Sequence, residues 1–272
     1  MRRTIASLCL ALLLPLVCLT GCGSQDPSPQ AEEPSQTAAV PEEPSAPQEE
    51  PEKPSPTPEK SRLIVLDPGH QARANTEQEP IGPGASETKM KVTGGTAGVA
   101  TGVPEYELTL TVSQLLRQEL EARGYQVIMT RESHDVNLSN QERAEIANQS
   151  GGDLFLRLHA NGSEDSTVQG AMTLCPTPQN PYPIGQLYAQ CRLLSDLVLA
   201  GLTEATGAQA QMVWETDTMS GINWCQIPVT IVEMGYMSNP QEDALLNDPA
   251  YQAKLAAGIA NGVDQYFAQT GG

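Results

Sequence analysis

Basic side chains are scarce in this sequence of 272 residues. Its 15 lysines and arginines stand against 33 aspartates and glutamates, which gives a formal net charge of -18. A protein that binds nucleic acid needs clustered Lys and Arg to neutralise phosphates. We therefore expect no nucleic-acid partner, and the same acidity argues against tight docking of the folded part on anionic lipid.

Long apolar runs are also scarce, and the one that exists lies within the first 22 residues. Arg2 and Arg3 precede an apolar stretch over 8–19, which is too short for an ordinary membrane-spanning helix. A Leu-Thr-Gly-Cys string follows and ends at Cys22; it resembles the lipobox of bacterial lipoproteins, where cleavage precedes a lipid-modified cysteine. Residues 1–22 are thus predicted to be a lipoprotein signal peptide whose lipidated Cys22 anchors the protein to the membrane. The alternative is a plain secretory signal with an incidental cysteine.

Large apolar side chains are nearly absent from residues 23–60, which hold ten of the 22 prolines and many glutamates. Such a segment cannot bury enough surface to offset its ordering entropy, so we predict a disordered linker. If mostly polyproline-like, it could reach roughly 100 Å from the outer face of the membrane into a cell wall. The alternative is a passive spacer of no fixed reach. Residues 61–272 then suit one large domain.

Cysteine is limited to six residues, none in a CxxC spacing. Cys9 and Cys18 leave with the predicted signal peptide, so that Cys175, Cys191 and Cys225 remain in the domain. An odd number cannot pair fully within one chain, and scattered cysteines do not resemble a zinc site. Cys191 lies on the apolar stripe of a predicted helix and is expected to be buried, whereas a Cys175–Cys225 disulfide is left open.

Apolar runs of strand length alternate with helical patterns along the domain. Alternating strands and helices predict a three-layer α/β/α fold with a mainly parallel central sheet. Apolar residues recur at spacings of three and four over 108–120 and 184–202, which predicts a helix in each range. Two further helices are predicted from their start signals: a Ser139–Glu142 capping box opens one through 147, and Asp248-Pro249 opens one to 267. The expected strands are 63–66, 126–130, 154–158, 170–174 and 229–232.

Two long segments carry no such pattern. Residues 71–104 are rich in glycine and threonine, and part of this segment is expected to be disordered. Residues 209–227 mix aromatic, charged and small side chains and contain Trp214 and Trp224. This second segment is predicted to form a substrate-binding wall.

Histidines and glutamates fall at positions where an α/β sheet builds its sites. His70 and His159 each follow a buried strand, at the end where open α/β sheets bind ligands. Glu233 ends another strand, and Glu105 opens a helix. Two neutral imidazoles and a carboxylate are a well-attested catalytic zinc set, and a second carboxylate can move protons. This pattern indicates metal-assisted amide hydrolysis.

Each of these residues also has a structural alternative. Either histidine could be a hydrogen-bonded core residue, and Glu105 could simply favour a helix N-terminus. Glu233 could pair with Arg131 or Arg157. The third histidine, His134, lies in a polar turn and is expected to be a solvated loop residue.

Six short strings around these residues occur in order along the chain. They are Leu-Asp-Pro-Gly-His70, Glu105 with its helix to Gly124-Tyr125, Thr130-Arg131-Glu132, Gln141 to Asn148, Leu158-His159-Ala160-Asn161, and Glu233 to Asn239. Together they strongly resemble the zinc-dependent N-acetylmuramoyl-L-alanine amidases of the Amidase_3 type, over nearly all of residues 63–267. The chain departs from that family at Gln71, where glycine is common, and in the length of the segment between His70 and Glu105.

The resemblance implies a peptidoglycan hydrolase that cuts the amide between N-acetylmuramic acid and the L-alanine of the stem peptide. Its zinc ligands would be His70, Glu105 and His159, and its catalytic residue Glu233. Asn161, Asn239 and the two tryptophans are candidate substrate-binding residues, although bracing roles are favoured for the asparagines. We expect a monomer that acts on peptidoglycan at the membrane surface. The rival hypotheses are a zinc carboxypeptidase acting on the stem peptide and an inactive wall-binding lipoprotein.

Overall fold

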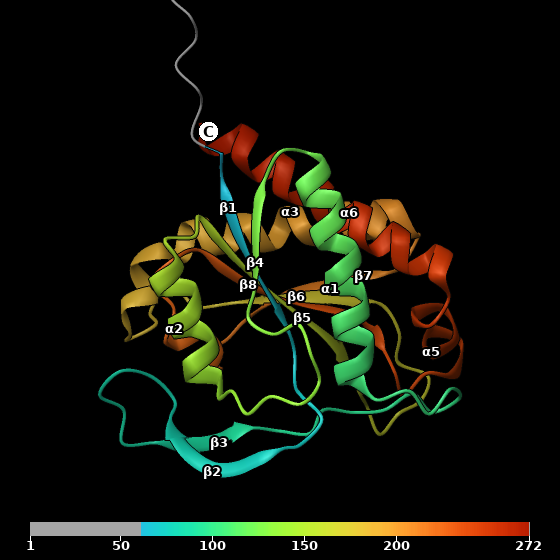
Figure 1. The fold of residues 1–272 in the computed structure, drawn as a ribbon, viewed down its shortest axis with the longest axis horizontal. Helices are drawn as coiled ribbons and strands as arrows, with labels where there is room; N and C mark the ends of the chain where they lie inside the picture. The colour runs from blue at the N-terminus through green and yellow to red at the C-terminus, as the bar shows by residue number, and fades with distance from the viewer. Residues whose placement is uncertain (1–60, 272) are drawn as a thin grey trace, which may run out of the picture. The chain divides into compact units, whose positions relative to one another are not determined.

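The computed structural model describes residues 61–271 (Figure 1). The predicted signal peptide, Cys22 and the linker lie outside the described residues. The strands are β1 (Leu63–Pro68), β2 (Asn75–Pro80), β3 (Thr88–Val92), β4 (Gln126–Met129), β5 (Leu154–Asn161), β6 (Ala171–Cys175), β7 (Ala210–Glu215) and β8 (Val229–Tyr236). The helices are α1 (Glu105–Ala122), α2 (Asn140–Ser150), a 3-10 turn η1 (Pro183–Leu187), α3 (Tyr188–Thr206), α4 (Ser220–Asn223), α5 (Pro240–Leu246) and α6 (Pro249–Thr270). Within this part of the chain no helix has the length and apolarity needed to cross a membrane.

Six strands form one sheet in the order β4-β1-β5-β8-β6-β7. The first four are parallel, and β6 runs antiparallel to β8 while β7 follows β6. Parallel strands covered on both faces are nearly continuous apolar runs, which is why these strands could be predicted from the sequence. The predicted three-layer fold with a mostly parallel sheet is confirmed.

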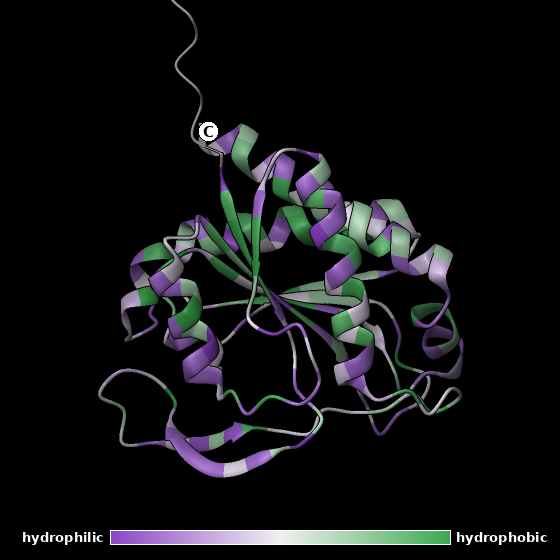
Figure 2. Ribbon diagram, viewed as in Figure 1, coloured by the Kyte–Doolittle hydropathy of each residue, from purple (hydrophilic) through white to green (hydrophobic). Residues whose placement is uncertain are grey.

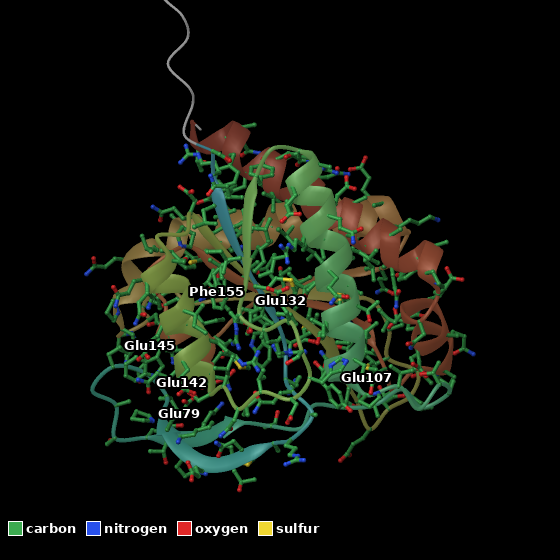
Figure 3. All side chains as sticks on the ribbon, in the orientation of Figure 1. Glu79, Glu107, Glu132, Glu142, Glu145 and Phe155 are labelled. Carbon is green, nitrogen blue, oxygen red and sulfur yellow. The ribbon has the colours of Figure 1, made fainter. Side chains whose placement is uncertain are left out.

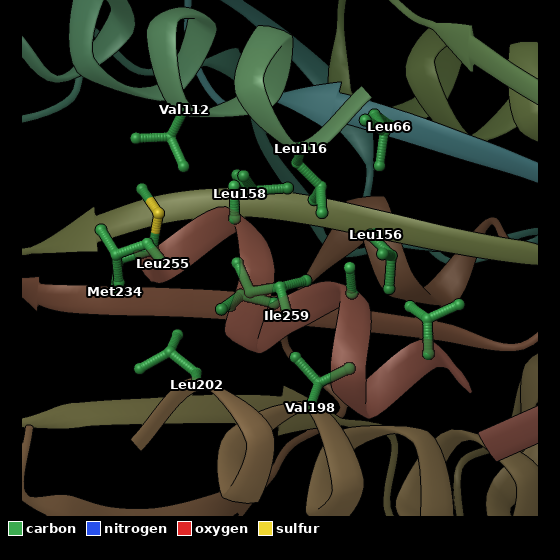
Figure 4. Packing of buried hydrophobic residues seen from close by; sticks show 14 of the residues in the cluster. Leu66, Val112, Leu116, Leu156, Leu158, Val198, Leu202, Met234, Leu255 and Ile259 are labelled. Carbon is green, nitrogen blue, oxygen red and sulfur yellow. The ribbon is translucent and has the colours of Figure 1, made fainter. Parts of the chain in front are cut away.

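Helices cover both faces of the sheet, and the larger core lies under α1, α3 and α6. Figure 4 shows this packing, in which strand residues such as Leu156 and Leu158 meet Leu116, Val198 and Ile259 from the helices. Each fully buried side chain of this kind contributes roughly 1.5 to 3 kcal/mol. The opposite face packs on α2 and α4 around Phe155. It is this second face that carries the polar side chains described below.

The predicted capping residues lie at the starts of their helices. Ser139 and Glu142 form the reciprocal capping box of α2, and Asp248 accepts a hydrogen bond from Tyr251 N at the start of α6. The expected helix over 184–202 instead begins as the 3-10 turn η1 and becomes α-helical at Tyr188. Helix α5, capped by Asn239, was not predicted because its seven residues are too few to show a period.

The expectation of disorder within residues 71–104 is wrong. This segment contains the antiparallel hairpin β2–β3, which is largely hydrophilic and lies apart from the sheet (Figure 2). Polar contacts rather than an apolar face hold it: Glu79 accepts from Gln141 N at the start of α2, and Asn140 Nδ2 donates to Lys91 O at 2.9 Å. Glu79 and Glu142 accordingly lie near one another beside α2 in Figure 3. A hairpin docked through side-chain amides and carboxylates leaves no hydrophobic periodicity in the sequence.

The second long segment also contains regular structure. Residues 210–215 form the edge strand β7, and residues 220–223 form α4. Cys175, Cys191 and Cys225 are all buried and all free, so the disulfide that was left open is absent from the described residues. Cys191 packs in the core as expected.

Candidate active site

The candidate site lies at the carboxyl ends of β1, β5 and β8. His70 follows β1, His159 lies near the end of β5, and Glu233 is its partner on the neighbouring strand β8. Glu105 is the first residue of α1 and is 3% exposed. The topology therefore brings together the four residues that the strand ends and the helix start had singled out.

One oxygen of Glu105 and one nitrogen of each histidine converge at a single point. Glu105 Oε1 lies 3.1 Å from His70 Nε2 and 3.1 Å from His159 Nδ1, and the two nitrogens are 3.2 Å apart. The other ring nitrogen of His70, Nδ1, donates to the Thr93 carbonyl at 3.0 Å, so the Nε2 of a neutral ring presents a lone pair. Three lone pairs at this separation repel one another unless a proton or a cation lies between them.

These three residues fit a divalent metal ion, and their ligand atoms all lie within 4.8 Å of one another. A tetrahedral zinc site with bonds of about 2.0 to 2.1 Å places neighbouring ligand atoms about 3.3 Å apart. Two imidazoles and one carboxylate with an open fourth position are also the donor set of catalytic zinc. The set therefore fits zinc in both its spacing and its chemistry.

The protonation states also suit a metal. Burial alone would raise the pKa of Glu105, but hydrogen bonds and charge from the two histidines outweigh it and hold the pKa well below its usual range. Backbone N–H groups of Thr96 and Ala160 donate to its two oxygens. Burial lowers the pKa of His159 to about 4, against the opposing hydrogen bond of Glu105. An ionised carboxylate and a neutral imidazole are the forms that bind zinc.

Glu233 stands beside this group with one oxygen unpaired. Its Oε2 is buried and has no hydrogen-bond partner among residues 61–271. Burial and the nearby charge of Glu105 raise the pKa of Glu233 to about 8. The alternative ion pair is wrong, because Arg157 pairs with Asp67 and Arg131 donates to backbone carbonyls. A carboxyl group with a pKa near neutrality can both accept and return a proton.

The chain around His70 is tightly constrained. His70 has a φ of 59°, the one positive value at a non-glycine residue of the described chain. Gly69 precedes it, and a side chain there would overlap the ring of His159. Arg143 donates to the carbonyls of Pro68 and His70 at 2.9 Å, while Arg131 donates to those of Pro68 and Gly69. Two guanidinium groups thereby fix the backbone that presents the first histidine.

Asp67 binds Arg143, one of those two residues, together with Arg157, a role that was not predicted from the sequence. It is 0% exposed and bonds Arg143 Nη1 at 2.7 Å and Arg157 Nε at 2.8 Å. Burial alone would raise the pKa of Asp67, but the charges of both arginines and the Thr130 hydroxyl hold it well below its usual range. A signal was present, since Asp67 and Arg157 are opposite charges that adjoin or interrupt the apolar runs 63–66 and 154–158.

A cavity of about 450 Å³ opens beside the four residues. The sheet forms its floor, β3 one wall and residues 218–221 another. None of the four candidate substrate-binding residues belongs to the cavity lining. Trp214 lies 45% exposed on the edge strand β7, and Trp224 donates its indole N–H to Pro80 O at 2.9 Å.

The two asparagines have local contacts. Asn239 caps α5, a bracing role of the kind favoured for it, and Asn161 accepts from the next backbone amide at Gly162. His134 is exposed in its loop as expected and packs edge-on against Tyr106.

Comparison with known proteins identifies relatives of the same kind over this whole region. A profile of the N-acetylmuramoyl-L-alanine amidase family matches residues 64–265, which include all four site residues. An N-acetylmuramoyl-L-alanine amidase of Mycobacterium tuberculosis is 27% identical over 214 residues, covering 77% of this chain and 88% of the relative. The germination-specific N-acetylmuramoyl-L-alanine amidase of Bacillus subtilis is 28% identical over 226 residues, covering 77% and 81%. The crystal structure of the amidase Ami1 from Mycobacterium smegmatis aligns with a TM-score of 0.68 at 26% identity, covering 76% of this chain and 97% of that one.

Proposed function

The chain belongs to the N-acetylmuramoyl-L-alanine amidase family, and on that premise we propose that it hydrolyses the amide between N-acetylmuramic acid and the L-alanine of peptidoglycan stems. One observation carries the proposal for this chain's own residues. Three metal-type ligand atoms converge beside Glu233, whose buried oxygen has no partner within residues 61–271, at the edge of a cavity.

His70, Glu105 and His159 would hold a zinc ion. Bound zinc would polarise the scissile carbonyl and lower the pKa of a water molecule toward neutrality. The Thr93 carbonyl supports this assignment because it fixes the tautomer in which His70 Nε2 is a ligand atom. Thr96 N and Ala160 N likewise orient the Glu105 carboxylate.

Glu233 would act as the general base and general acid. It accepts a proton from the attacking water and passes it to the alanine nitrogen, which then leaves as a neutral amine. Burial raises the pKa of Glu233 to about 8 in the metal-free protein, and a pKa above the ordinary range of a carboxyl suits the return of the proton to the leaving nitrogen. Glu233 is half-buried on β8 and is the strand partner of His159. Its carboxyl would therefore lie next to the reacting carbon.

We further propose that Cys22 carries lipid and that residues 23–60 tether the domain to the outer face of the membrane. The string that ends at Cys22 and the proline-rich composition of the segment after it support this arrangement. The domain, as a monomer, would then reach peptidoglycan from the membrane side.

The test is digestion of purified peptidoglycan by the full-length chain supplied with zinc. We expect intact stem peptides with new L-alanine amino termini and glycan strands that have lost their stems, both identified by mass spectrometry. Shortened stems that remain on the glycan would instead indicate a carboxypeptidase. An absence of any released product would indicate a binding protein.

Three variants separate the roles of the residues. Glu233→Gln should lower the rate at least about 100-fold and leave bound zinc stoichiometric, because general acid–base groups contribute about 10²- to 10⁴-fold. His70→Ala should lose both zinc and activity. The matched control is His134→Ala, since this exposed histidine lies outside the ligand group and should leave both unchanged. Full activity of Glu233→Gln would refute the proposed mechanism.

A further inference from the structure

The cavity beside the site is cationic, although the domain around it is acidic. Apart from His70, His159 and Glu233, its only ionisable lining residues within the described part of the chain are Lys89 and Arg157. The whole chain carries a formal charge of -18, whereas this lining holds two cations, Lys89 and Arg157, and one carboxylate, Glu233. A cavity lined in this way favours an anionic group on its ligand.

Arg157 is built into the cavity floor. It is 3% exposed, and it bonds Asp67 through Nε and Asn140 Oδ1 through Nη2 at 2.7 Å. Asp67 is shared with Arg143, so one ion-paired carboxylate serves two guanidinium groups, while the charge of Arg157 also acts on the nearby carboxyl of Glu79. Nη1 lies against Gly221, where a side chain would overlap it. A glycine is therefore needed for the guanidinium to occupy this place.

Lys89 reaches the cavity from the opposite wall. It lies on β3, and its ammonium donates to the Thr218 carbonyl at 2.6 Å, which is its one hydrogen bond among residues 61–271. An ammonium has three donors, so two remain for a ligand. The hairpin is held here by Asn140, which bonds both Lys91 O and Arg157. One asparagine therefore links Arg157 to the strand that carries Lys89.

We propose that Lys89 and Arg157 bind a free carboxylate on the stem residue that follows L-alanine, so that the enzyme prefers stems with glutamate there over stems with isoglutamine. This inference rests on the proposed amidase function. Arg157 and His159 are two residues apart on one face of β5, a separation of about 7 Å. A γ-linked glutamate places its α-carboxylate about 6 to 7 Å from the alanine nitrogen that leaves. The carboxylate would thus lie above Arg157 while the scissile amide lies beside His159 and Glu233.

The experiment compares two soluble, uncross-linked glycan-strand preparations that differ only in this stem residue, glutamate or isoglutamine. The zinc-loaded full-length chain is assayed for released stems, and kcat and KM are measured for each. We expect kcat/KM to favour the glutamate form about tenfold, since charge-assisted hydrogen bonds are about twice as strong as neutral ones. The difference should lie mainly in KM, because the carboxylate is bound equally before and during reaction.

Lys89→Gln should reduce this preference to about twofold, and Lys89→Arg should retain it. Lys91→Gln is the matched control, because Lys91 lies two residues along the same strand and pairs with Glu77 outside the cavity. Equal turnover of both preparations by the wild type, or an unchanged preference in Lys89→Gln, would overturn this inference alone. Release from neither preparation would overturn the amidase proposal itself.

Discussion

Replacing Asp67 by asparagine tests the role assigned to the buried arginines. The substitution keeps the shape of the side chain and removes its charge. Arg143 and Arg157, which are 0% and 3% exposed, would then lose the one carboxylate that both of them contact. The asparagine could still accept one hydrogen bond, so the loss is electrostatic rather than steric.

The expected cost is large. Removing one partner of a buried ion pair typically costs about 3 to 5 kcal/mol, because the remaining charge stays buried without compensation. A domain is usually stable by only about 5 to 15 kcal/mol, so Asp67→Asn should remove about a fifth or more of the free energy of unfolding. Arg143 also holds the carbonyls of Pro68 and His70, so zinc retention should weaken together with stability.

Urea denaturation of the full-length chain measures the first effect and zinc titration the second. Asp196→Asn is the control, since Asp196 forms an exposed pair with Arg192 and should cost about 1 kcal/mol or less. The pKa of Asp67 is depressed in the folded state, so its contribution is complete above its ordinary pKa of 3.8. The gap between wild type and Asp67→Asn should therefore stay constant from pH 5 to 8 and shrink as the pH falls below about 4.

The reasoning would be refuted if Asp67→Asn cost no more than Asp196→Asn at pH 7. A gap of the expected size that grew toward low pH would also contradict it, because protonated Asp67 and asparagine should then become equivalent. Either result would mean that groups other than Asp67 compensate the buried charges of Arg143 and Arg157.

Three other predictions follow from single contacts. Gly221→Ala should displace Arg157 and cost about 1 to 3 kcal/mol in urea denaturation, whereas Gly94→Ala, which meets nothing within 4 Å, should be near neutral. Burial raises the pKa of Glu233 from 4.5 to about 8, so the metal-free native state holds a proton that the unfolded chain releases. Glu233→Gln should therefore be the more stable protein in chelator, by a margin that grows from pH 5 to 8 in thermal melts, and a margin independent of pH would contradict this. Trp224→Phe should speed amide hydrogen exchange in β2 and β3, because one bond that docks the hairpin is lost, and unchanged exchange there would show that this bond does not hold it.

The sheet and its three main helices could be predicted because burial imposes a pattern on them. β1, β5 and β8 are mostly apolar, and α1 and α6 carry apolar residues at helical spacing. The hairpin β2–β3 could not be found in this way, since polar side chains such as Glu79 and Asn140 dock it. The edge strand β7 alternates in burial, but apolar Met212 and Trp214 occupy exposed positions, so the sequence pattern does not follow the burial.

The sequence by itself determined which residue types could bind a metal and where along the chain they fall. His70, His159 and Glu233 were visible because each follows a buried run, and the carboxyl ends of parallel strands meet at one edge of a sheet. These facts depend only on local order and on the hydrophobic effect. They indicated the chemistry before any distance was known.

Only the tertiary structure decided how those residues are held and what lies beside them. The 3.1 Å contacts of Glu105, the arginines gathered around Asp67 and the cavity between Lys89 and Arg157 join segments far apart in the chain. Such contacts leave no periodic trace, because a buried charge is stabilised by its partner and not by its neighbours in sequence. Trp214 and Trp224 were predicted from local composition to bind substrate, but the fold places both of them outside the cavity lining.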